Sequence, residues 1–113
     1  MTAMKPARTP TMTETDMKKT IPLKLDNKVY AVRPTFALVR EIEVELGGVA
    51  DLRAQFAGDG WRVSDLVALI QMMLQAAGRT VDYAALGNAL LNEGVAHYLA
   101  AAQVFLDMVL HGE

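Results

Sequence analysis

The chain lacks cysteine altogether, and several other catalytic tools are scarce among its 113 residues. Without cysteine there is no disulfide framework, no thiolate nucleophile, no iron–sulfur cluster and no sulfur-based zinc site. Serine occurs once, at Ser64, so serine-nucleophile chemistry has a single candidate. The most apolar stretch, residues 95–110, is interrupted by polar residues and falls short of the ~18–20 residues that cross a bilayer. The N-terminus also lacks the apolar core of a signal peptide, so we expect a cytoplasmic protein without membrane contact.

Proline is missing after Pro34, and charge changes sign at the same place. Residues 1–33 carry seven Lys or Arg against three Asp or Glu, whereas residues 34–113 carry four against ten. The net charge is −2, and Tyr30 is the one aromatic residue of the basic part, so the sequence gives little support for nucleic-acid binding. An apolar content of 52% excludes wholesale disorder and fits one small domain.

The first part of the chain is predicted to contain a disordered extension and a hairpin. Residues 1–18 show no apolar periodicity, so we expect a disordered N-terminal extension there and one domain over residues 19–113. Met17 is an alternative translation start to Met1. Residues 20–33 alternate apolar and polar side chains on both sides of an Asp-Asn pair, which predicts a β-hairpin.

The remainder is predicted to be helical, in segments at about residues 35–46, 49–57, 64–77, 81–92 and 95–110. Thr35 and Ser64 are the expected N-caps of the first and third segments. The predicted fold class is mainly α: a short N-terminal β-hairpin followed by a small bundle of four to five helices.

Two of the predicted helices, 64–77 and 95–110, have wider apolar faces than one core-facing stripe requires. The first is expected to be the central helix of the bundle. For the second, we predict that Tyr98, Phe105 and Val109 form an exposed flank that binds a partner, because the polar tip of tyrosine tolerates a wet rim. The alternative is that all three are core residues.

Candidate chemical groups have simpler structural explanations. Glu93 and His97 are four residues apart, but a metal site needs a third ligand, so a solvated helix-surface pair is the better interpretation. Glu41 and Glu45 fit a solvated helix face. Ser64 lacks the glycines of a nucleophile elbow. We therefore expect no catalytic residue, no metal and no cofactor.

Two further features leave alternatives open. Met72 and Met73 are either core residues or a soft contact surface for a partner. Trp61 follows a glycine-containing loop and is either a peg that packs this loop onto the bundle or an interface anchor, of which we favour the peg.

Several short motifs occur in an order that resembles a known family. They are residues 28–36 (KVYAVRPTF), 42–47 (IEVELG) and 61–66 (WRVSDL), followed by Glu93-Gly94 and Phe105-Leu106. In order and spacing they resemble the small tail protein of gene transfer agents and related prophages, over most of residues 23–110. Members of this family are labelled either tail tube protein or tail assembly chaperone, and the resemblance implies no catalytic residues.

The predicted helix content favours the second label. A tail tube subunit is built from long β-strands, whereas the strand signal here is confined to residues 20–33. The resemblance to a chaperone implies a protein that coats the helical tape measure protein until tube subunits displace it. The expected partners are the tape measure protein and tail tube subunits, with a second copy of the chain as a further candidate. The alternatives are a structural tail subunit located in the virion and a small nucleic-acid-binding regulator.

Overall fold

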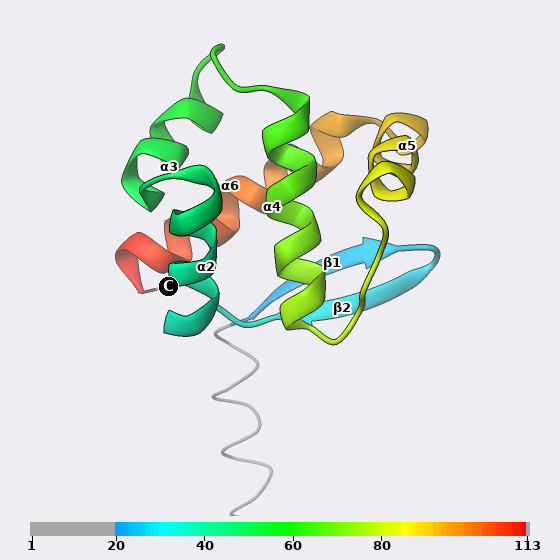
Figure 1. Cartoon of the computed structure of the whole chain (residues 1–113), viewed down its shortest axis with the longest axis horizontal. Coiled ribbons are helices and arrows are strands. Elements are labelled where there is room, and N and C mark those ends of the chain that lie inside the picture. The colour runs from blue at the N-terminus through cyan, green and yellow to red at the C-terminus, as the bar shows by residue number, and fades with distance from the viewer. Residues whose placement is uncertain (1–19, 113) are drawn as a thin grey trace, which may run out of the picture.

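The structure, a computed structural model, describes residues 20–112 of the chain, so the extension predicted for residues 1–18 lies outside the described residues. Two strands come first and five helices follow (Figure 1). Their bounds are β1 Ile21–Leu25, β2 Lys28–Val32, α2 Phe36–Leu46, α3 Val49–Ala57, α4 Val63–Ala76, α5 Tyr83–Glu93 and α6 Val95–His111. The predicted fold class, a hairpin followed by a small helical bundle, is confirmed.

The hairpin is antiparallel and a turn of two residues joins its strands. Asp26 and Asn27 form the turn with φ values of 54° and 65°, a left-handed conformation that these two residue types tolerate. The register pairs Ile21 with Val32, and side chains alternate along β1 so that its apolar residues are buried. The two strands form a sheet on their own, and such a small sheet needs to pack on other elements to be stable.

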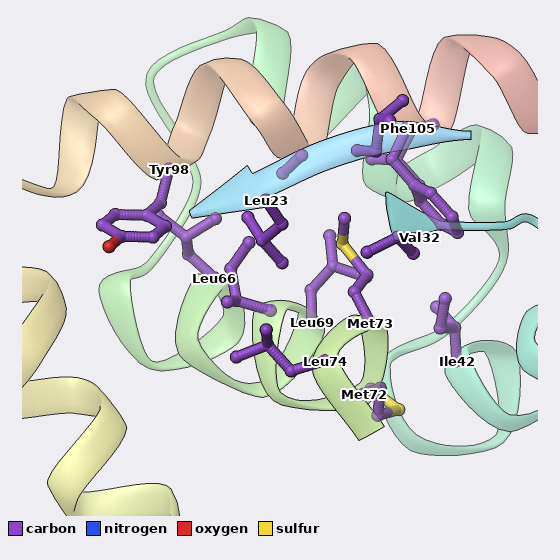
Figure 2. Packing of buried hydrophobic residues seen from close by; sticks show 14 of the residues in the cluster. Leu23, Val32, Ile42, Leu66, Leu69, Met72, Met73, Leu74, Tyr98 and Phe105 are labelled. Carbon is purple, nitrogen blue, oxygen red and sulfur yellow. The ribbon is translucent and has the colours of Figure 1, made fainter. Parts of the chain in front are cut away.

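Helix α4 forms the centre of the core. It contacts α2, α5 and α6, and strand β2 packs against it as well. Figure 2 shows side chains of α4, α6 and the hairpin meeting in one cluster. The predicted central position of this helix is therefore confirmed. Its buried residues are Leu66, Val67, Leu69, Ile70, Met72, Met73 and Leu74.

The first helix begins as predicted. Thr35 is the N-cap of α2, and its Oγ1 accepts a hydrogen bond from the backbone N–H of Leu38 at 3.2 Å. Thr35 therefore fixes the start of α2, and with it the position of Phe36, the first residue of this helix. Phe36 borders a surface groove.

The predicted N-cap of the third helical segment is wrong. Helix α4 begins one residue before Ser64, its N-cap is Arg62, and no side chain caps it. Ser64 is an exposed residue of the first turn, and its backbone carbonyl accepts a hydrogen bond from the Tyr83 hydroxyl at 3.0 Å. This contact ties the start of α5 to the start of α4.

Trp61 lies in the loop before α4 and packs against the preceding helix. The centroid of its ring is 6.2 Å from that of Phe56, and the side chain is half-buried against the core. This position favours the peg interpretation over the interface anchor. None of the described helices combines the length and apolar character needed to span a membrane.

Candidate functional site

Tyr98 and Phe105, predicted to be exposed, are core residues. Tyr98 is 1% exposed and Phe105 is 0% exposed, so the predicted exposure of this flank of α6 is wrong. The reason is the number of elements that pack on α6: α3, α4, α5 and β1 all contact it. In Figure 2 both rings point from α6 toward the cluster that contains Leu23 and Val32 of the hairpin.

The Tyr98 hydroxyl holds the hairpin to α6. It lies 3.0 Å from the backbone oxygen of Lys24 and 3.0 Å from Oε1 of Glu93, and both oxygens are acceptors for its one hydrogen. Burial, together with the hydrogen bond to Glu93, raises the pKa of Tyr98 to about 12. The polar tip that suggested an interface is therefore satisfied inside the fold, where it locks a strand in place.

Val109, the third predicted partner-binding residue, is only half-buried and borders a groove. The groove lies between the start of α2 and the end of α6 and has a volume of about 230 Å³. Its lining is Pro34, Thr35, Phe36, Val39, Met108, Val109 and Gly112. Space of this size accommodates one or two large apolar side chains, so Val109 remains a candidate contact residue.

Phe36 lines the same groove, although the sequence did not predict it as a contact residue. Its side chain is 78% exposed, the largest exposed fraction among the large apolar residues of the described chain. A helical wheel contains the signal, because Phe36 is rotated away from the face formed by Leu38 and Ile42. A large aromatic side chain that lies outside the core-facing stripe of its helix is expected on the surface rather than in the core.

A second groove is polar and lies between α2 and α4. It has a volume of about 240 Å³. Glu41 and Glu45 line it from α2, and Gln71 and Gln75 line it from α4. The two glutamates are exposed, as predicted, but they share this groove rather than an open helix face.

The remaining candidate groups do not form a chemical site. Glu93 interacts with Tyr98, and the His97 ring is exposed and meets the Tyr98 ring edge-on at 5.5 Å. Residues 20–112 contain no group of three or more His, Cys, Asp or Glu residues that could hold a metal ion. Within residues 20–112 the surface therefore has an apolar groove and a polar groove but no such cluster of metal-binding side chains.

Comparison with known proteins gives one informative result. The family described as "phage tail tube protein, GTA-gp10" matches the chain over residues 18–112. No curated protein and no solved structure matches the chain. The match includes the hairpin, the central helix and both grooves. The chain thus belongs to this phage and gene-transfer-agent tail protein family.

Proposed function

We propose that this tail protein is a non-enzymatic tail assembly chaperone. It binds amphipathic helices of the tape measure protein in the cytoplasm of the bacterial host and keeps them in solution until the tube forms. The observation that carries the proposal is the groove between α2 and α6, which is lined mainly by apolar side chains and flanked by the exposed ring of Phe36.

The groove has the properties of a helix-binding site. An amphipathic helix presents apolar residues at intervals of three and four positions, and such residues insert into apolar grooves between helices. Here the two walls come from α2 and α6. Val39, Met108 and Val109 supply apolar contacts, and the unbranched side chain of Met108 is the adaptable one among them. Phe36 provides an aromatic edge of the kind that dominates binding energy at interfaces.

The size of the sheet supports a chaperone over a tube subunit. A tube wall built from subunits needs long strands that pair across subunit boundaries, because unpaired strand edges must be closed. The sheet described here has two strands of five residues each. The family description names a tail tube protein, so a structural subunit of the virion tail is the second candidate function.

Co-expression with the tape measure protein tests the proposal. The wild-type chain should increase the soluble fraction of the tape measure protein, and Phe36→Asp or Val109→Asp should abolish this effect. Val44→Asp is the matched control, because Val44 is 77% exposed on the same helix and does not line the groove. Equal loss with all three variants would contradict the assigned groove.

Analysis of purified particles separates the two candidate functions. A chaperone is absent from finished tails, whereas a structural subunit is present in stoichiometric amount. Detection of the chain in tails at the copy number of a tube component would overturn the chaperone proposal.

A further inference from the structure

One edge of the hairpin is covered and the other is open. Strand β1 packs against α6, and the backbone oxygen of Lys24 lies 3.0 Å from the Tyr98 hydroxyl. Pro22, the other β1 residue whose backbone faces this edge, has no N–H to donate. Figure 1 shows β2 as the outer strand of the hairpin, on the side away from α6. Strand β2 therefore provides the open edge.

The register of the hairpin determines which backbone groups face this open edge. Residue pairs in an antiparallel ladder alternate between those bonded to each other and those whose N–H and C=O groups face away. The Lys24 carbonyl faces away from β2, because it lies against the Tyr98 hydroxyl. The backbone groups of its partner Val29, and of Ala31 two residues later, therefore face away from β1. Both residues are exposed, and within residues 20–112 no other group bonds to these outward N–H and C=O groups.

The side chains of β2 divide between two faces of the hairpin. Lys28, Tyr30 and Val32 share the inner face, because they pair with the buried residues of β1. Val29 and Ala31 lie on the outer face, and Val29 is 65% exposed. The edge of β2 thus combines unpaired backbone groups with an exposed apolar side chain, and such an edge is a template for pairing with another strand.

We propose that β2 pairs antiparallel with β2 of a second copy of the chain, so that the two hairpins form one continuous sheet. An antiparallel strand edge is complementary to itself, because a two-fold rotation places its N–H groups opposite its C=O groups. The outward backbone groups set the register: Val29 of each copy pairs with Ala31 of the other, and each pair exchanges both hydrogen bonds. Tyr30 of each copy then lies at the two-fold axis.

The side chains that meet in this register identify a second copy as the occupant. On the outer face Val29 lies beside Ala31 of the other copy, which covers an apolar side chain that the single chain leaves exposed. On the inner face Lys28 lies opposite Val32 of the other copy, so the two lysines are at opposite ends of the contact. A parallel arrangement would place the lysines next to each other, where like charges repel. The strand therefore matches its own copy in the antiparallel direction only.

The charges near the axis do not oppose the contact. Arg79 lies over the Tyr30 ring, 5.8 Å from its centroid, and it is paired with Asp26 at 3.1 Å. Each copy therefore brings a neutralised pair to the axis rather than a free cation. A two-fold contact is closed, so it produces a dimer and not an open-ended wall. It uses neither the α2–α6 groove nor the α2–α4 groove, so it leaves the groove assigned to the tape measure protein free.

Sedimentation velocity of the purified full chain tests the proposal. Wild type should show a monomer–dimer equilibrium that shifts with concentration. Ala31→Pro should weaken association by about tenfold or more, because it removes half of the N–H donors of the contact. Proline is tolerated at edge positions whose N–H faces outward, as Pro22 is in β1, so the variant should remain folded by circular dichroism. The matched control is Ala31→Val, which keeps the N–H group and should associate like wild type.

Disulfide crosslinking tests the register independently of the proline variant. The chain lacks cysteine, so a single introduced cysteine reports on one position. Tyr30→Cys should form a covalent dimer under mild oxidation, because the two positions face each other at the axis. Lys24→Cys is the control, because it is exposed on β1, one strand further from the axis, and should not crosslink.

Three results would overturn the proposal. The first is a wild type that is monomeric at its highest soluble concentration, which would also be the result if only a strand of another protein pairs with β2. The second is an Ala31→Pro variant that is folded and associates like wild type. The third is equal crosslinking through positions 24 and 30, since random collision rather than strand pairing gives that pattern.

Discussion

Helices α6 and α2 differ in how far their large apolar side chains are exposed, and the difference is the opposite of what their sequences suggest. Helix α6 is rich in large apolar residues and its sequence predicts an exposed aromatic flank, yet Tyr98 and Phe105 are buried. Helix α2 carries many charged residues, yet it exposes Phe36 and Val44 to solvent at 78% and 77%. Apolar content alone therefore does not identify which helix presents a binding surface.

The number of neighbouring elements explains the difference. Helix α6 is surrounded by three helices and a strand, whereas α2 packs mainly on α3 and α4. A helix with neighbours on several sides buries a wide apolar face, and a helix at the edge of the bundle buries only one stripe. Apolar residues outside that stripe then remain exposed.

The largest expected effect comes from a charge placed in the face that is fully covered. Phe105→Asp should cost about 5 kcal/mol, because it removes a buried ring and buries a carboxylate. That cost approaches the whole stability of a small domain, so the variant should be unfolded by circular dichroism. The counterpart on the edge helix, Phe36→Asp, should remain folded with a nearly unchanged melting temperature. A folded Phe105→Asp variant would contradict the described core.

The next effect concerns the hydroxyl that fastens the hairpin to α6. Tyr98→Phe should cost about 1–2 kcal/mol in chemical denaturation, because Glu93 and the Lys24 carbonyl lose their shared donor. The ring remains in place, so the fold should persist.

The Tyr98 hydroxyl also makes the stability of the wild type depend on pH in a way that Tyr98→Phe should not share. Because the pKa of Tyr98 is raised from 10.0 to about 12, the folded chain retains this proton more tightly than the unfolded chain. The resulting stability is complete below pH 10 and is lost as the pH rises through 12. Wild type should therefore lose more stability than Tyr98→Phe between these values, and parallel curves would contradict the buried position of the hydroxyl.

Local sequence signals predicted most of the fold. Three features depend on residues close together in sequence: the Asp-Asn turn, the alternation of buried and exposed side chains along β1, and the Thr35 cap. All three are present in the structure. The cap predicted at Ser64 is wrong because α4 begins one residue earlier, at Val63, which places Ser64 inside the first turn rather than at the N-cap.

The candidate site was harder to predict, since it depends on long-range packing. Val109 and Phe36 are 73 positions apart in the chain but line one groove. The apolar periodicity of each helix does not predict that the start of α2 and the end of α6 lie side by side. The sequence could show that Phe36 leaves the core stripe, but only the packing of α6 shows what lies next to it.

A smaller effect on the free energy of unfolding is expected from substitutions at the starts of α2 and α4. Thr35→Ala should cost about 1 kcal/mol, because the N–H of Leu38 loses its acceptor. Ser64→Ala should change the free energy of unfolding by less than about 0.5 kcal/mol, because the Tyr83 hydroxyl bonds its backbone carbonyl rather than its side chain. Thermal and chemical unfolding of both variants measure the contrast, and equal costs would mean that Ser64 does cap its helix.

The smallest effect on the melting temperature is expected from removing residues that precede the hairpin and lie outside α2 and α6. A chain that starts at Met17 should melt within a few degrees of the full chain, because the family match begins at residue 18 and the hairpin at Ile21. Such a chain retains α2, α6 and every contact described for Tyr98, so it should also solubilise the tape measure protein as the full chain does. Differential scanning fluorimetry of the two chains measures the shift. A large loss of stability would show that the residues before Met17 contribute to the stability of the fold, which would contradict the prediction that they are dispensable.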